Sequence, residues 1–307
     1  MAKRRKSIGR PLCWVSGILV ISVCLLIIVF LVLKGAQVIT WDFLTHDPKP
    51  SLQEALSGGI LSPILGTIIL ITLGIGFTVP WALATAIYLA EYSRDTQVIK
   101  VLRTGIDVLS GVPTIVFAIF GLAIFTNPQL GVFSTMVEGV EDAKAFGRSF
   151  FVGALTMAAM VLPFVVKSME EALRSVPFTY REASYALGAS KWATITRVVL
   201  PAAGPGIITG VILGIGRIAG DTAIVWLCLG GSMILTGPQP WWQPANWLDT
   251  LQNTGSTLTS YIYYSSPAGE GNSPNKAFGA GLVLIVIILA LNAVVDYLGR
   301  FIRLKEE

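Results

Sequence analysis

Long apolar stretches separated by short polar segments dominate the chain. A helix needs about 20 apolar residues to cross a hydrocarbon core of roughly 30 Å. Six stretches of this kind occur, and only Arg217, Asp221 and the near-terminal Asp296 are charged within them. They predict an all-α integral membrane protein with six transmembrane helices, at about residues 12–32, 61–90, 108–126, 150–166, 202–229 and 277–298.

The composition also indicates a bilayer as the surroundings of the chain. Of its 307 residues 53% are hydrophobic and 13% are charged, whereas about 25% are charged in a soluble domain. The mean hydropathy of +0.70 agrees, and a soluble enzyme is therefore not expected. Cys13, Cys24 and Cys228 all lie in apolar runs, so neither a disulfide framework nor a cysteine-rich metal site is indicated.

The basic residues predict the orientation, because Lys and Arg are enriched in cytoplasmic loops. With the N-terminus inside, the cytoplasmic segments hold 16 of the 22 Lys and Arg residues, the outer segments hold 5, and Arg217 is the remaining one. This distribution predicts an N-in, C-in topology and explains the net charge of +4 without a nucleic-acid partner. The expected organisation is a basic tail over 1–11, a retained anchor helix over 12–33 and a main domain over 61–299, with a cytoplasmic loop 167–201 and an outer loop 230–277.

The cytoplasmic loop has a pattern of its own. Thr179 and Glu182 have the spacing of a capping box, which predicts a short helix that ends near Gly188. A second helix is expected from Ser190 to Leu200, before Pro201 opens the next span. Exposed apolar residues on this helix pair favour a docking surface for a partner protein, and a merely solvated or re-entrant loop is the alternative. These residues are Ala183, Tyr185, Ala186, Leu187 and Trp192.

The same loop carries a recognisable motif. Glu182-Ala183-Ser184-x3-Gly188-x9-Val198-x-Leu200-Pro201 resembles the signature Glu-Ala-Ala-x3-Gly-x9-Ile-x-Leu-Pro of ABC importer permeases. Residues 176–192 are closer still to the phosphate-specific branch, the PstA-type permease subunits, and residues 86–92, 106–116 and 220–223 match as well. The resemblance implies a type I ABC importer permease fold and a docking site for an ATPase, formed by Tyr180, Arg181, Glu182, Ala183, Gly188, Lys191 and Trp192.

The resemblance also implies partners. They are an ABC ATPase subunit, a second homologous permease and an extracytoplasmic phosphate-binding protein, with phosphate as substrate and an inner, plasma membrane as the location. No lysine follows a glycine, so a Walker A loop is absent; the chain is expected to bind no cofactor and to leave ATP hydrolysis to the partner. Molybdate, sulfate and phosphonate are the alternative substrates, and an anion channel is a further alternative.

The fifth apolar stretch contains the candidate substrate site. Gly206, Gly210 and Gly214 are four residues apart, which allows neighbouring helices to approach closely. On a continuous helix Arg217 and Asp221 extend this stripe and face the packed interior. A guanidinium donates in parallel to two oxygens of an oxyanion and stays charged, although a charge at this depth is costly.

Arg217, Asp221 and Thr222 are therefore expected to line the substrate path. The alternative is an Arg217–Asp221 ion pair that only fixes helix packing. The phosphate permeases carry Arg-x-x-Gly-Glu-Thr at this place, and this chain has Asp221 instead of the Glu.

The outer loop is rich in aromatic residues. They suggest an interfacial belt or, as the alternative, a contact with the binding protein; they are Trp241, Trp242, Trp247, Tyr261, Tyr263 and Tyr264. His46 is the only histidine and lies in another outer segment, and no clustered metal ligands are visible. A membrane-embedded enzyme is therefore disfavoured and no metal site is predicted.

Overall fold

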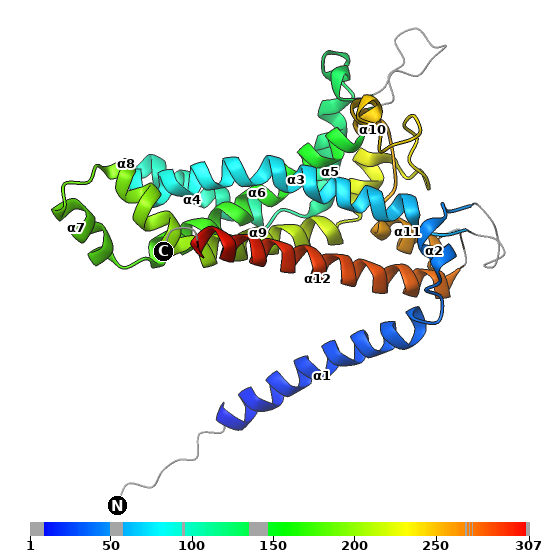
Figure 1. Cartoon of the computed structure of the whole chain (residues 1–307), viewed down its shortest axis with the longest axis horizontal. Helices are drawn as coiled ribbons and strands as arrows, with labels where there is room; N and C mark the ends of the chain where they lie inside the picture. The colour runs from blue at the N-terminus through cyan, green and yellow to red at the C-terminus, as the bar shows by residue number, and fades with distance from the viewer. Residues whose placement is uncertain are drawn as a thin grey trace, which may run out of the picture.

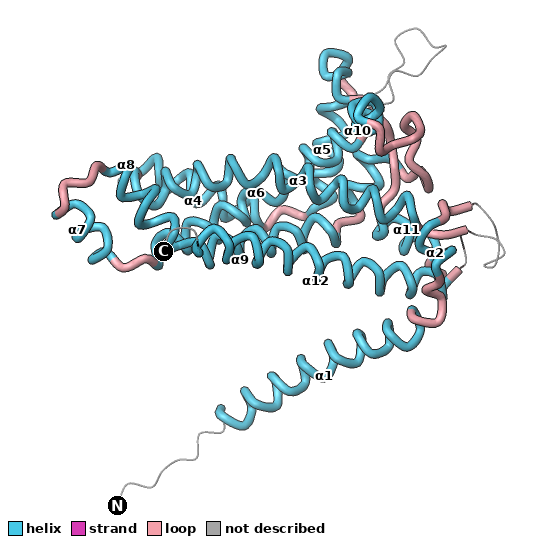
Figure 2. The backbone as a smooth tube through the Cα atoms, viewed as in Figure 1, coloured by secondary structure: helices cyan, strands magenta, loops and turns pink. Residues whose placement is uncertain are grey.

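The computed structural model describes residues 9–49, 58–93, 96–134, 147–267, 269, 271 and 273–304. In this part of the chain every regular element is a helix, apart from one isolated bridge between Pro48 and Gly58. Figure 1 and Figure 2 show an elongated bundle in which α3, α6, α9 and α12 follow the long axis. The all-α prediction is confirmed. Several basic residues used to predict the orientation lie outside the described residues: Lys3, Arg4, Arg5, Lys6, Arg94, Lys144 and Lys305.

Within the described residues, five helical stretches are long and apolar enough to cross a membrane, and a bent helix pair brings the number to six. The five are formed by α1 (Gly9–Gly35), α3 (Leu61–Ile87) with the π-helix η2 (Tyr88–Tyr92), α6 (Phe150–Ser175), α9 (Leu200–Gly220) with the preceding α8 (Lys191–Thr194) and η4 (Ile195–Val199), and α12 (Pro274–Leu304).

The third predicted span is a bent pair instead of one helix. Helix α4 (Gln97–Ser110) and helix α5 (Thr114–Phe125) meet at an angle of 101°. Pro113 separates them; it has no backbone N–H and disfavours helical geometry at the residue before it. The expectation of a single helix over 108–126 is therefore wrong.

Helix α6 is the centre of the bundle and packs against α3, α4, α5 and α9. The glycines of α9 lie close to α6. A Cβ atom at Gly206 would lie 2.5 Å from Cβ of Ala172, and one at Gly210 would lie 3.1 Å from Oγ of Ser168. The predicted close packing of α9 is confirmed.

The segment predicted to form the cytoplasmic loop differs from the expectation at three points. Helix α6 continues to Ser175, so the loop begins after it and not at Lys167. Helix α7 (Phe178–Ala186) begins after Pro177 without a side-chain cap, so the predicted Thr179 capping box is wrong. Pro201 does not begin a separate span, because it follows the π-helix η4, where the helical hydrogen-bond pattern is already shifted. The predicted terminator Gly188 is confirmed, with φ +79.

Helix α1 stands apart from the bundle and meets α12 near one end (Figure 1). The rings of Phe30 and Phe278 are 5.3 Å apart there. The beginning of α1 and the end of α12 lie toward the same end as α7 and α8, as an N-in, C-in topology requires; which side faces the cytoplasm stays a prediction. The remaining elements are α2 (Trp41–Thr45), η3 (Pro128–Phe133), η5 (Val225–Gly230), η6 (Pro244–Asn246), α10 (Trp247–Gln252) and α11 (Leu258–Ser265).

Candidate functional site

The fifth predicted span is interrupted at the candidate site. Helix α9 ends at Gly220, and Asp221 is extended, with φ −77 and ψ 135. The backbone N–H of Ile224 donates to Oδ1 of Asp221 at 2.8 Å, so this side chain starts the following helical segment, as short acidic side chains commonly do. The expectation of one helix over 202–229 is wrong, and Asp221 does not share the helical stripe of Arg217.

Arg217 lies half-buried in the last turn of α9. Its Nε donates to Sδ of Met160 at 3.2 Å, and its guanidinium carbon lies 5.5 Å from the ring centroid of Phe164. Within the described residues, no carboxylate is at ion-pair distance and the Nη groups form no hydrogen bond. The alternative of an Arg217–Asp221 ion pair is therefore not observed, and the two Nη groups are available to a ligand.

Asp221 joins the broken helix to two other elements. The Thr114 hydroxyl, at the first residue of α5, lies beside its carboxylate. The Thr259 hydroxyl in α11 donates to the Asp221 carbonyl at 3.1 Å. Thr222 is half-buried, and its carbonyl accepts from Trp226 N–H at 3.0 Å. The first turns of α5 and α11 thus lie beside Asp221. The N-terminus of a helix carries partial positive charge.

One side of α9 near Arg217 remains uncovered in the single subunit. Leu213, Gly216 and Gly220 are exposed on it, and a Cβ at either glycine would meet nothing within 4 Å. The guanidinium therefore lies at the border between the packed core and an open helix face.

The structure places most of the predicted docking residues on the surface of α7 and α8. Leu187 is 89% exposed and Trp192 is 61% exposed. Ser184, which stands where the signature has Ala, is buried and forms a 2.9 Å hydrogen bond with Thr194 that joins the two helices. The exposed predicted residues are Tyr180, Glu182, Ala183, Gly188, Lys191 and Trp192.

Arg181 differs from the other predicted docking residues because it is buried. Its guanidinium pairs with Glu91 at 2.6 Å, so it is not available as a surface contact. Sequence reasoning did not select Glu91, although it lies in the matching segment 86–92. It also did not select Met160, Phe164 and Thr114, because contacts between distant helices leave no local pattern.

The segment predicted to form the outer loop folds back onto the bundle in part. Tyr261 of α11 is only 4% exposed, so the prediction that it belongs to an interfacial belt is wrong, because α11 packs against α3 and α12. Trp242, Trp247 and Tyr263 are exposed, and either predicted role remains open to them.

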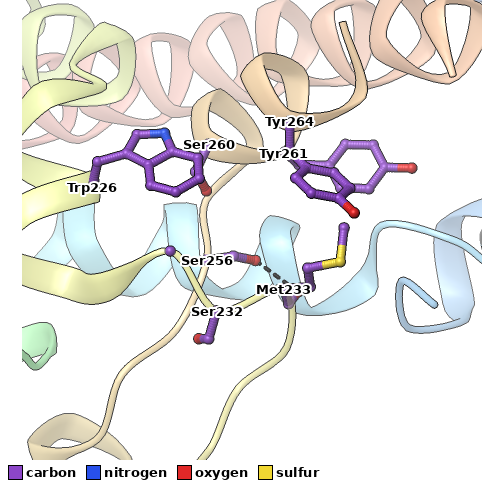
Figure 3. A pocket seen from close by; sticks show the side chains of 8 residues that line it. Trp226, Ser232, Met233, Ser256, Ser260, Tyr261 and Tyr264 are labelled. Carbon is purple, nitrogen blue, oxygen red and sulfur yellow. Dashed lines mark hydrogen bonds between the residues drawn. The ribbon is translucent and has the colours of Figure 1, made fainter. Parts of the chain in front are cut away.

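A small pocket lies where η5 meets this outer segment. Figure 3 shows Trp226, Met233, Tyr261 and Tyr264 around it, with the Ser256 hydroxyl bonded to the Met233 carbonyl at 2.9 Å. The described lining consists of aromatic, hydroxyl, thioether and glycine groups without a charged side chain. It therefore offers no cationic side chain to an oxyanion, unlike the surroundings of Arg217.

The chain is similar in sequence to known membrane transport proteins. The profile of the family described as "Binding-protein-dependent transport system inner membrane component" matches residues 82–305. The phosphate transport system permease protein PstA 1 of Mycobacterium tuberculosis (strain ATCC 25618 / H37Rv) is 35% identical over 81% of this chain and 72% of its own length. The phosphate transport system permease protein PstA of Mycobacterium leprae (strain TN) is 34% identical, over 92% and 80%.

Two solved structures have a similar fold. A chain of a bacterial alginate ABC transporter, in complex with its alginate pentasaccharide-bound periplasmic protein, superposes with a TM-score of 0.61 at 18% identity, over 98% of this chain and 99% of that chain. A chain of the inward-facing MetNI methionine ABC transporter gives 0.54 at 15% identity, over 81% and 96%. The predicted type I ABC importer permease fold is confirmed.

Proposed function

Since the chain belongs to the family of inner membrane components of binding-protein-dependent transport systems, we propose that it is the permease subunit of an ATP-driven phosphate importer. The observation that carries the proposal is the half-buried Arg217, whose Nη groups have no protein acceptor within the described residues. Phosphate supplies the missing acceptor oxygens. The named function of the mycobacterial relatives supports the same substrate.

Arg217 acts as a transient contact for the anion on its path. A guanidinium fork donates to two phosphate oxygens in parallel and remains charged at every physiological pH. The nearby carboxylate of Asp221 weakens the net attraction, which allows the anion to leave as well as to bind. Thr222 follows at the same break and offers a hydroxyl to the path.

A second, homologous permease completes the path. It covers the open face of α9 that carries Leu213, Gly216 and Gly220. Membrane lipid surrounds the two permeases. An extracytoplasmic phosphate-binding protein delivers the anion at the end that carries α10 and α11. Without a partner, the Arg217 side of α9 has nothing to enclose an ion.

The energy comes from a separate ABC ATPase that hydrolyses ATP. It docks on the exposed surface of α7 and α8, which presents Tyr180, Glu182, Ala183, Gly188, Lys191 and Trp192. The chain itself binds no cofactor. Alternating access then follows from movement of this cytoplasmic end against the spanning helices.

The decisive experiment is anion competition during uptake. The complete complex is reconstituted in vesicles with ATP inside and the phosphate-binding protein outside. Excess unlabelled phosphate is expected to abolish uptake of labelled phosphate, whereas sulfate, molybdate and phosphonate are not. Competition by one of those anions instead would assign the importer to that oxyanion, and uptake without ATP would indicate a channel.

A further inference from the structure

The two helices of the cytoplasmic end contact one turn of the spanning bundle. This turn is η2, the π-helix that ends α3. Arg181 of α7 donates from Nε to both carboxylate oxygens of Glu91, at 3.1 and 3.3 Å, and from Nη2 at 2.6 Å. Lys191 of α8 lies 4.4 Å from the ring centroid of Tyr92. Side chains of both helices therefore touch the end of α3.

The Glu91–Arg181 pair is withdrawn from water. The two side chains are only 6% and 11% exposed. Arg181 also donates to the carbonyls of Val176 and Leu173 at 2.8 and 3.0 Å, at the end of α6. A forked, charge-assisted contact of this kind fixes direction as well as distance, and loss of one partner leaves a buried charge unpaired. Helix α7 is thus fastened to α3 and α6 at once.

A second set of charges holds the same turn. The π-helical pattern pairs Ser93 N–H with the Tyr88 carbonyl, and the Leu89 carbonyl instead accepts from Arg103 of α4 at 3.0 Å and from Arg174 of α6 at 3.2 Å. These two arginines share Glu170, at 3.1 and 2.9 Å. The end of α3 is therefore tied to α4 and α6 as well as to α7.

The same helix also reaches the candidate site. A Cβ atom on Gly74 of α3 would lie 2.8 Å from Cδ1 of Ile218, the residue after Arg217. About 25 Å of helix separates Gly74 from Glu91, at the usual rise of about 1.5 Å per residue. Helix α3 thus connects the α7 contact at its end with the Arg217 turn beside its middle.

We infer that the Glu91–Arg181 pair is the coupling contact of this subunit, which transmits movement of the docked α7 to α3 and from there to the turn that holds Arg217. Glu91 and Arg181 are positioning residues, since neither meets the anion. The inference rests on the proposed function in one respect, because it takes α7 as the helix on which the ATPase docks.

The test compares phosphate uptake with ATP hydrolysis in the complete reconstituted complex. E91Q keeps the size of the side chain and removes its charge. The phosphate taken up per ATP hydrolysed is expected to fall about tenfold, within the roughly 5- to 150-fold range of coupling between sites, while the ATPase still co-purifies in wild-type amount. R181K keeps the positive charge but loses the forked guanidinium, so a smaller fall in phosphate taken up per ATP hydrolysed is expected.

D107N is the matched control. It breaks the nearby Lys167–Asp107 ion pair, whose charged atoms are 2.8 Å apart and whose side chains are 50% and 56% exposed. Exposed ion pairs contribute little. D107N is therefore expected to keep the wild-type ratio of phosphate taken up to ATP hydrolysed.

Four results separate the possibilities. A wild-type ratio in E91Q overturns the inference while the proposed function stands. Loss of the ATPase from E91Q also overturns it, because the pair would then only support the docking surface. If E91Q accumulates poorly, R181K alone tests the inference. A wild-type ratio of phosphate uptake to ATP hydrolysis in R181K then overturns it. A wild-type complex that takes up phosphate without ATP contradicts the proposed function instead.

Discussion

Nε of Arg217 donates to Sδ of Met160 at 3.2 Å, across the contact between α9 and α6. A thioether is a weak acceptor, so this bond orients the guanidinium without neutralising it. The Nη groups keep their full capacity for an oxyanion.

R217A is expected to abolish phosphate uptake and leave membrane insertion intact, because the neighbouring Gly220 break is set by Asp221 and not by the arginine. R217K is expected to lower uptake roughly 10- to 150-fold, which corresponds to the 1.5–3 kcal/mol of a charge-assisted hydrogen bond. M160L removes the sulfur at similar volume and is expected to lower uptake less than R217K does, because the guanidinium itself remains. Wild-type transport by R217A would contradict the role in the path.

Asp221 is expected to matter first as the start of the segment that follows α9. D221A removes the acceptor of Ile224 N–H and should lower the free energy of unfolding by about 0.5–2 kcal/mol. D221N should restore this stability, because Asn accepts the same bond. Thermal unfolding in detergent checks both variants, and equal losses in the two would show that the charge and not the cap is needed for stability.

The glycines of α9 allow a test of helix packing. G206A places a Cβ atom 2.5 Å from that of Ala172 and is expected to destabilise the subunit by about 1–3 kcal/mol through overpacking. G216A meets nothing within 4 Å and should change the free energy of unfolding by less than about 1 kcal/mol. Denaturation of the two variants side by side measures the difference; similar losses would argue against the α6–α9 contact.

The docking surface can be mapped with single cysteines. L187C and W192C lie at positions that are 89% and 61% exposed and are expected to cross-link to the ATPase. T194C, at a position that is 1% exposed, is expected not to react. The background replaces the exposed Cys13 and Cys24 by Ser and keeps the buried Cys228. A cross-link at T194C but not at L187C would place the partner elsewhere.

Sequence reasoning identified the features that depend on local chemistry. Apolar stretches of spanning length predicted the membrane helices, since the cost of placing polar groups in hydrocarbon acts on every residue of a span. The four-residue glycine spacing predicted the α9 contact. Gly188 predicted the end of α7, because its φ of +79 is easy only for glycine.

The breaks could not be located from the apolar pattern alone. Residues 108–126 and 202–229 are apolar throughout most of their length, yet α5 turns away from α4 by 101° and α9 stops at Gly220. Pro113 was a visible signal for the first break. The second depends on Asp221, whose carboxylate takes up a backbone N–H that a continuous helix would have used internally.

The sequence by itself thus determined that the protein lies in a membrane, that it is helical, and which residue types occur at the candidate substrate site and the docking surface. It could do so because hydrophobicity, charge and glycine act locally. Only the tertiary structure decided the partners: Arg217 with Met160 instead of Asp221, and Arg181 with Glu91 instead of the surface. The first two residues are 57 positions apart in the sequence, and the second two are 90 positions apart. These pairings arise from the packing of whole helices, which no short stretch of sequence encodes.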